Sequence, residues 1–431
     1  MKRNVAGAKW KIGSGLLGLA LFSSFANAEG INRPDLPPQA QIDRALNQHL
    51  LVLNATNELK IEHTNQRKWN SGNYEFNVRA GTGQRSVTST GEKLKEWDIG
   101  LERPLRLLNK VGIDEGIGVA SVARAEYALG DARHEAARTL LQMWFAWLRE
   151  QAQITLWQQQ VDIFKQQVQL VEKRVKAGDA PKLELNLAQA AAAQANVPLH
   201  QAQLREQLAS NDLQRQFPAI LLPEKLLPVT PQVVEHDFAF WKSRVLEHNH
   251  ELGIVQQQNL VQQLLAQRSR ADQLPDPTVG VRYAKEASGG EKVAGVYVSI
   301  PLPSVQRRAT ADSAIQQAAI AADQEAFVKR RLESDIYATH TQAVSSYNTW
   351  QQAHEAAQAI RSNAELVAKA YTLGENSLSD SLTARRFALE SSLAENLAQL
   401  DANEARYRLL LDAHQLWSLD QDEDEHHAKH Y

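Results

Sequence analysis

The chain has 431 residues, 23% of them charged, a formal net charge of −3 at pH 7 and no cysteine. Without cysteine, neither a disulfide nor a lipid on an N-terminal thiol is possible, and we expect no nucleic-acid partner at this charge balance. Beyond residue 28 no apolar run approaches a membrane-spanning helix, but the alternating strands of a transmembrane β-barrel would escape a hydropathy scan.

Residues 1–28 have the three parts of a secretory signal peptide. Basic residues come first, a short apolar core follows from Ile12 to Phe22, and Ala26-Asn27-Ala28 forms a small-residue cleavage site. The apolar core is too short to span a bilayer as a helix. We expect cleavage after Ala28 and export of a mature chain that is held together by packing alone.

A helix over 41–68 is expected to lead into a β-hairpin. Strict apolar–polar alternation predicts two strands, Tyr74–Ala80 and Glu96–Glu102, joined by a polar loop. This alternation fits a solvated hairpin on a globular core, and it also fits a barrel hairpin between lipid and a water-filled lumen. The signal peptide and the repeat described below favour the barrel.

Pro104 ends the second strand, and a helical pattern follows to about Lys176. Its second half spaces apolar residues alternately by three and four, which is the seam of a coiled coil. These residues are Ile154, Trp157, Val161, Phe164, Val168, Val171 and Val175. A helix of ~70 residues at 1.5 Å per residue is roughly 100 Å long, so it belongs in an extended bundle.

A partner helix is expected from Pro181 to about Gln216, with Pro198 kinking or splitting it. The prolines within 217–237 then break the helical pattern, and we expect this join to lie on the outside of the bundle. A helix is expected over 238–272, and it begins a second half that repeats the pattern of the first.

Two landmarks recur at nearly the same distance. Gly374 follows Gly178 by 196 residues (374 − 178), and the strand-ending Pro301 follows Pro104 by 197 residues (301 − 104). Landmarks of different type that recur in the same order indicate a duplicated structural unit of just under 200 residues.

The two glycines are expected to form the tips of two long helical hairpins. Gly commonly ends a helix in the left-handed conformation, and Asp179 and Ser377 are N-cap residue types for the helix that restarts. Acidic residues cluster at both tips. They are Asp179, Glu184, Glu375 and Asp380.

No pattern in the chain indicates catalysis. A Gly-rich phosphate loop, a nucleophile elbow and a zinc-protease motif are all missing from the sequence, so we expect neither an enzyme nor a cofactor. His248 and His250 would not share a helix face, and we read His340, His354 and His414 as isolated surface or packing residues. We therefore predict no metal site. Histidines in the tail could bind metal loosely, although a solvated tail is the favoured interpretation.

From about residue 40 to 415 the pattern resembles the TolC family of outer-membrane efflux channels. The resemblance rests on two repeats of helix, β-hairpin, long helix and long helix, and on tips with Gly, polar residues, an acid and then Ala. The pieces Ser299–Pro303 and Glu247–Leu252 look most like the outer-membrane component of cobalt-zinc-cadmium type, or heavy-metal RND, efflux systems.

The resemblance implies a mostly α fold with a β-barrel part, in which three chains share a 12-stranded outer-membrane barrel above a periplasmic α-helical tunnel. Four strands cannot close a barrel alone, and open edges in lipid leave backbone groups unpaired, so a homotrimer is expected.

The predicted division is a signal peptide (1–28), a first repeat (29–217; hairpin about 73–104, long helices about 106–216), a linker (218–237), a second repeat (238–417; hairpin about 278–301, long helices about 309–415) and an acidic, His-rich, disordered tail (418–431).

The resemblance also implies a periplasmic gate at the tip of the second hairpin. Tyr371 and Asp380 match the tyrosine before the tip glycine and the acid after it, whereas Asn376 and Thr383 depart from the arginine and second acid of drug-type channels. Three copies of Asp380 would form a single acidic ring that attracts cations. Asp380 is equally well read as a helix-start acid at the positive end of the helix dipole, and the two roles are compatible.

The implied function is a passive exit duct in the outer membrane. The tips at Ala177–Leu185 and Leu373–Leu382 would dock a periplasmic adaptor and, through it, an inner-membrane RND-type pump. The exported substrate could be metal cations, drugs or, in type I secretion, proteins. A periplasmic coiled-coil scaffold that never inserts into the membrane is the alternative from another class.

Overall fold

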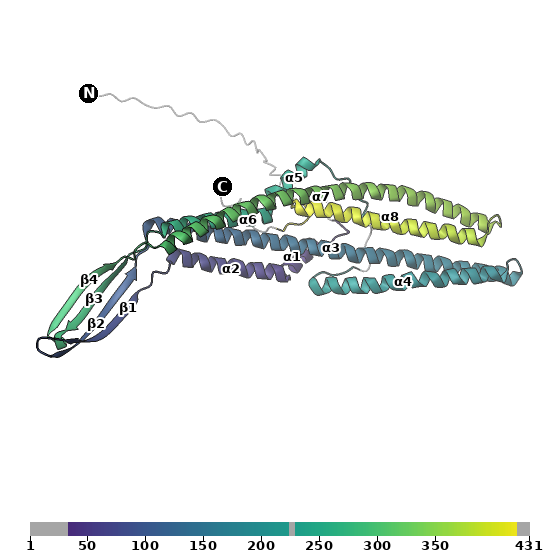
Figure 1. The fold of residues 1–431 in the computed structure, drawn as a ribbon. Coiled ribbons are helices and arrows are strands. Elements are labelled where there is room, and N and C mark those ends of the chain that lie inside the picture. The colour runs from purple at the N-terminus through teal and green to yellow at the C-terminus, as the bar shows by residue number, and fades with distance from the viewer. Residues whose placement is uncertain (1–32, 224–228, 420–431) are drawn as a thin grey trace, which may run out of the picture. The chain divides into compact units, whose positions relative to one another are not determined.

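The fold is one series of elements used twice. The computed structural model describes residues 33–223 and 229–419 (Figure 1), so Ala28, part of the predicted linker and the tail from residue 420 lie outside the described residues. The first copy consists of α1 (Gln39–Gln48), α2 (Leu50–Ser71), β1 (Asn77–Ser86), β2 (Lys93–Pro104), α3 (Leu108–Ala177) and α4 (Lys182–Gln216). The second consists of α5 (Phe238–Glu247), α6 (His250–Ala271), β3 (Thr278–Glu286), a 3-10 turn (Ala287–Gly289), β4 (Glu291–Ser299), α7 (Val305–Thr372) and α8 (Leu378–Asp412).

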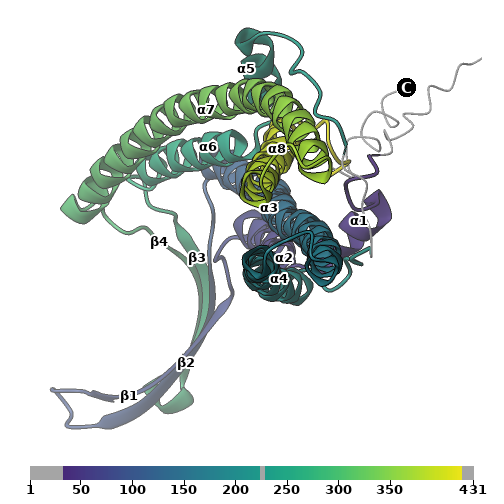
Figure 2. The same ribbon diagram turned by 90° about the vertical axis from the view of Figure 1, so that its right-hand side faces the viewer.

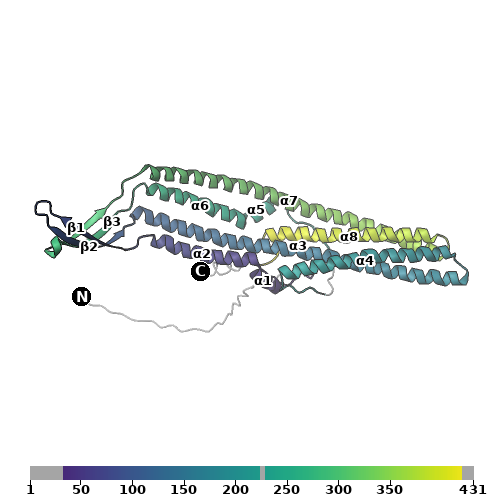
Figure 3. The ribbon, with the colours of Figure 1, turned by 60° about the horizontal axis from the view of Figure 1, so that its bottom comes forward.

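The long helices are confirmed in number, order and length. α3 has 70 residues and α7 has 68, while α4 and α8 have 35 each. Within the unit that begins at Pro34, the four strands lie at one end of the helices and the α3–α4 and α7–α8 turns lie at the other (Figures 1 and 3). The described chain is therefore mostly helical with one small sheet.

Two helices that the sequence predicts as continuous are each broken in two. Residue His49 is extended (φ −72°, ψ 138°) between α1 and α2, and its ring stacks on Phe217 at 5.0 Å. Asn249 is extended (φ −74°, ψ 110°) between α5 and α6, and its side chain accepts a hydrogen bond from the backbone N–H of Leu252. Tertiary stacking and an N-cap thus override the local helical pattern.

Pro198 does not split α4, which is helical from Lys182 to Gln216. Proline removes the donor to the carbonyl four residues earlier, here that of Gln194. Gln194 is an exposed residue, where water can replace the missing donor. The expectation of a split was therefore wrong.

The largest core lies where α1, the linker and the C-terminal residues pack on the middle of α3. Trp144, Phe145 and Trp147 of α3 are buried at its centre. Phe217 and Ile220 are fully buried in the same cluster, so the start of the linker is part of the core and not on the outside of the bundle. Leu419 is also buried there, which places the first residues of the predicted tail in the packed structure.

The strands form one antiparallel sheet in the order β1-β2-β3-β4, and the sheet curves away from the helices (Figure 2). Each strand is longer than, or shifted from, the predicted segment, because pairing extends into the loop that was expected to be irregular. Tyr74, expected in the first strand, precedes β1 and donates its hydroxyl hydrogen to Asp276 Oδ2 at 3.0 Å.

A buried lysine holds the root of the sheet to the helices. Lys110 of α3 is 0% exposed, and its Nζ lies 3.0 Å from Asp272 Oδ1 and 2.9 Å from Asp276 Oδ1. Nζ also donates to the backbone carbonyl of Leu274 at 2.9 Å. A buried charge needs such partners, and no sequence pattern pointed to this cluster.

Candidate functional site

Both hairpin tips turn on a glycine in the left-handed conformation, as the sequence predicts. Gly178 has φ 86° and Gly374 has φ 77°. After Gly178, the N–H of Asp179 reaches the carbonyl of Arg174 at 2.9 Å, and after Gly374 the N–H of Glu375 reaches the carbonyl of Ala370 at 2.9 Å. These six-to-one bonds satisfy the last carbonyls of α3 and α7, so the two tips are built alike.

The helices that leave the tips begin in different ways. At the second tip the Ser377 Oγ accepts the backbone N–H of Asp380 at 3.1 Å and donates to Asp380 Oδ2 at 2.6 Å, so Ser377 is the predicted N-cap. At the first tip the N-cap is Pro181, which offers no side-chain acceptor. The expectation that Asp179 caps α4 was wrong, because the helix begins two residues farther on.

Tyr371 of α7 joins the two hairpins. Its side chain is 4% exposed and packs in a small apolar cluster with Val171 and Ala188 of the first hairpin. Arg174 Nη1 donates to the tyrosine hydroxyl oxygen at 2.7 Å, and the hydroxyl donates to Glu184 Oε2 at 3.1 Å. The Arg174 guanidinium also lies 5.2 Å from the ring centroid. We call Arg174, Glu184 and Tyr371 the tip lock.

Burial and the neighbouring Glu184 carboxylate raise the pKa of Tyr371 above its ordinary value of 10.0. Both causes favour the neutral phenol, which can donate to Glu184. At neutral pH the phenol therefore keeps the proton that it donates to Glu184.

The structure separates the two predicted gate residues. Tyr371 faces the first hairpin, whereas Asp380 is exposed on the first turn of α8 and closes on its own cap. Gly178, Asp179 and Glu375 are exposed at the ends of the hairpins, where a docking partner could reach them. Arg174, which completes the lock, was not singled out from the sequence, although it lies one turn before the tip glycine.

Two histidines that the sequence analysis reads as isolated are not isolated. The Nδ1 of His354 lies 2.6 Å from Glu395 Oε1, which also pairs with Arg361 across the α7–α8 hairpin. His414 lies against His134 and His250. His340 contacts the ring of Phe238 at 5.9 Å, which agrees with a packing role.

The sheet has one apolar and one polar face, as the alternation predicts. Pairing aligns Val78 with Leu101, Leu101 with Val281, and Val281 with Val296, so one apolar row crosses all four strands. All four of these side chains are exposed in the single chain. On the other face the Tyr297 hydroxyl donates to Glu102 Oε2 at 2.6 Å.

Along the described chain, every helix is too short or too polar to cross a lipid bilayer by itself.

Comparison with known proteins gives a consistent result. Residues 39–216 match the family described as outer membrane efflux protein. No curated protein sequence matches the chain significantly.

Solved structures share the fold over most of the chain at low sequence identity. The outer membrane channel CmeC of Campylobacter jejuni has a TM-score of 0.71 and 15% identity, with 90% of this chain and 88% of that chain covered. The outer membrane protein VceC of Vibrio cholerae has a TM-score of 0.72 and 16% identity, with 88% and 99% covered. CusC has a TM-score of 0.66 and 15% identity, with 88% of this chain and 91% of that chain covered. Residues 39–216 thus resemble the outer membrane efflux protein family, and most of the chain shares the fold of these outer membrane channels.

Proposed function

We propose that the protein is the outer-membrane exit duct of a tripartite efflux system and works as a homotrimer. The observation that carries this proposal is a sheet with an exposed apolar row and two open edges, at the end of the unit opposite the hairpin tips. The family match supports the same conclusion.

The open edges argue for assembly. β1 and β4 each pair on one side only, so each presents a row of backbone donors and acceptors. In lipid such groups are costly unless a neighbouring strand pairs with them. Three copies would supply twelve strands, and β1 of one chain pairing with β4 of the next would close a barrel. The apolar row would then face lipid and the face with Glu102 and Arg282 would face water.

The tip lock would hold the periplasmic entrance closed. Arg174 and Glu184 bind the second hairpin to the first through Tyr371, so the hairpins cannot separate while these bonds remain. In a trimer the exposed Asp380 carboxylates would lie near the three-fold axis and favour cations. An adaptor that contacts the exposed tips would open the entrance by replacing the bonds of the lock.

An inner-membrane RND-type pump would supply the energy, because the duct has no motif for nucleotide binding. Metal cations are the favoured cargo, from the likeness of the segments at Ser299–Pro303 and Glu247–Leu252 to the cobalt-zinc-cadmium type. Export of drugs or proteins through the same fold is the alternative.

Fractionation tests the proposal. Heat-modifiable trimers in the outer membrane that conduct ions in planar bilayers are the expected result. A monomer released with the periplasmic fraction would overturn the duct and favour the coiled-coil scaffold.

A charge on the apolar face tests the orientation of the sheet. Val298 lies on the same face of β4 as Val296, and Val298→Arg should destabilise the inserted trimer by about 2–4 kcal/mol. Gly295→Arg is the matched control, since Gly295 lies on the other face of β4, and no described heavy atom would crowd a Cβ there. Equal tolerance of arginine at the two positions would contradict a lipid-facing apolar row.

A further inference from the structure

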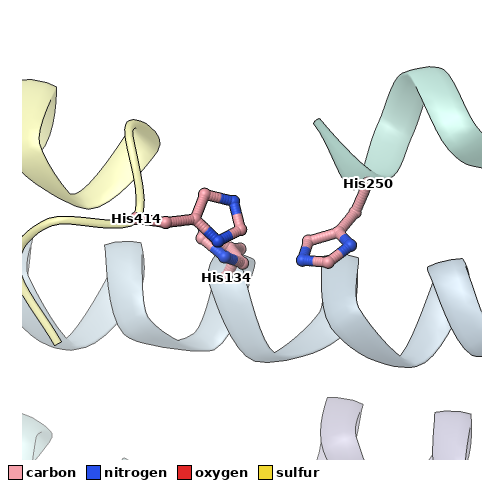
Figure 4. Close-up of side chains that lie close together, drawn as sticks. All are labelled: His134, His250 and His414. Atoms are coloured by element: carbon pink, nitrogen blue, oxygen red, sulfur yellow. The ribbon is translucent and has the colours of Figure 1, made fainter. Parts of the chain in front are cut away.

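Three histidines that are distant in the sequence meet beside the middle of α3. His134 lies within α3, His250 is the first residue of α6, and His414 follows the end of α8 (Figure 4). One imidazole nitrogen from each lies within 4.8 Å of the other two. The ring centroids are 4.1 Å apart for His134 and His414, 5.0 Å for His134 and His250, and 5.2 Å for His250 and His414.

The backbone positions each ring with unusual local geometry. A Cβ at Gly130 would lie 2.5 Å from the ring of His250, so the missing side chain there makes room for this histidine. His414 has φ 58°, a left-handed conformation that is unfavourable for a residue with a Cβ. His134 is 3% exposed, and it forms the floor of the cluster. The absent side chain at Gly130 and the left-handed backbone at His414 thus allow the three imidazoles to converge.

We propose that His134, His250 and His414 bind one divalent transition-metal ion of the kind that prefers imidazole, with Zn²⁺ as the leading candidate. Neutral imidazole nitrogen is a common ligand of Zn²⁺, at about 2.0–2.1 Å from the metal. The nitrogens are already close enough that small rotations of the rings would bring all three to one ion. The fourth position would be taken by water or by His248, whose ring centroid lies 5.6 Å from that of His414.

The surroundings favour a cation. A cavity of about 260 Å³ next to the histidines is lined by more carboxylates than arginines. The carboxylates are those of Asp131, Glu135, Glu251, Asp335 and Asp412, and the arginines are Arg138, Arg331 and Arg408. Carboxylates near metal-binding histidines orient the rings and increase the basicity of their nitrogens.

A metal at this position would cross-link the two repeats. It would connect α3 of the first repeat to the start of α6 and to the end of α8, far from the tip lock. The site does not depend on what the duct exports, because its ligands lie apart from the residues assigned to the sheet faces and the tips.

Metal titration of the purified full chain tests the site. Because His426, His427 and His430 could bind metal independently, all three are first replaced by Ala. This protein should bind one Zn²⁺ per chain by calorimetry, and Co²⁺ in place of Zn²⁺ should give the visible absorption of a nitrogen-ligated site. Zn²⁺ should also raise its unfolding temperature.

Ligand variants identify the residues. In the tail-substituted background, His250→Gln and His414→Asn should each lower the Zn²⁺ affinity at least about 100-fold. Asn is chosen at 414 because it tolerates positive φ. The matched control is His200→Ala, an exposed histidine of α4, and its affinity should not change. A tail-substituted protein that binds no Zn²⁺ and no Co²⁺, or ligand variants that bind as well as the control, would overturn the proposal and leave only a stacked histidine cluster.

Discussion

The two hairpin tips have the same backbone and use their acids differently. Each tip has a left-handed glycine, an N-cap residue three residues after it and a helix that begins one residue later. The acid on the first turn is Glu184 in the first hairpin and Asp380 in the second. Glu184 reaches across to Tyr371, whereas Asp380 hydrogen-bonds with its own N-cap, Ser377.

This difference follows from the caps. Ser377 offers a hydroxyl to Asp380, while Pro181 offers nothing to Glu184, which remains free to bind another hairpin. The two tips therefore share a backbone geometry and differ at the cap residue, and only the acid at the first tip joins the two hairpins.

Loss of the shared tyrosine should have the largest effect. Tyr371→Ala removes a buried ring between the hairpins and should destabilise the tip region by about 3–5 kcal/mol. Val175→Ala, at the corresponding position of the first tip, should have a much smaller effect because Val175 is only partly buried. Denaturant unfolding, with limited proteolysis at the tips, measures both. Equal losses would show that the two tips do not differ.

Valine at the tip glycines should affect the two hairpins equally. Among the described residues, no heavy atom would lie within 4 Å of a Cβ at Gly178 or Gly374, so only backbone strain opposes the change. Each of Gly178→Val and Gly374→Val should destabilise its hairpin by about 1–2 kcal/mol. Adaptor cross-linking and export, measured in both variants, test whether tip geometry matters for docking. Unchanged export in Gly374→Val would separate docking from the shape of the tip.

Neutralising Glu184 and neutralising Asp380 should change two different properties of the channel. Glu184→Gln should weaken the lock by about 1 kcal/mol and raise the frequency of channel opening, with little change in ion preference. Asp380→Asn should lower the cation-to-anion permeability ratio while the trimer remains intact. Planar-bilayer recordings report both quantities. If the ratio stays constant in Asp380→Asn, this residue is a capping acid away from the pore.

Alkaline pH should weaken the tip lock, and this is the smallest of the expected effects. Because the pKa of Tyr371 is raised in the folded chain, its stabilising contribution is complete below pH 10.0 and is lost as the pH rises through the raised value. A tyrosinate would then face the Glu184 carboxylate. Tyrosinate absorbance and tip proteolysis, followed together, detect the change. Tyr371→Phe should not show it, and a matching transition in that variant would place its origin elsewhere.

The local patterns of the sequence predicted most of the fold. The three-and-four spacing of apolar residues from Ile154 to Val175 is sustained over several turns, and only a long helix satisfies it. Alternation within a strand predicts that every second side chain shares a face. Pairing in register preserves this period of two and brings Val78, Leu101 and Val296 to one face of the sheet.

What the sequence did not predict depends on contacts between distant segments. The break at His49 depends on a ring at Phe217, and the partner of Tyr371 at Arg174 lies 197 residues away. His414 gave no sign of the histidines it meets, since nothing near it in the sequence resembles a metal motif. Such contacts require the fold to be known before the site is visible.

The length of α3 has a mechanical consequence. This helix begins four residues after β2 ends and continues without interruption to the first tip, so its 70 residues fix a distance of about 105 Å between the sheet and the tip. α7 measures the same interval from β4, and seven residues added to one helix alone would shift its tip by about 10 Å against the other. The nearly equal lengths of α3 and α7 therefore keep the two tips level with each other. The number of residues between Pro104 and Gly178 sets the distance between the sheet and the tip. The membrane that holds the sheet and the partner that reaches the tips must be separated accordingly.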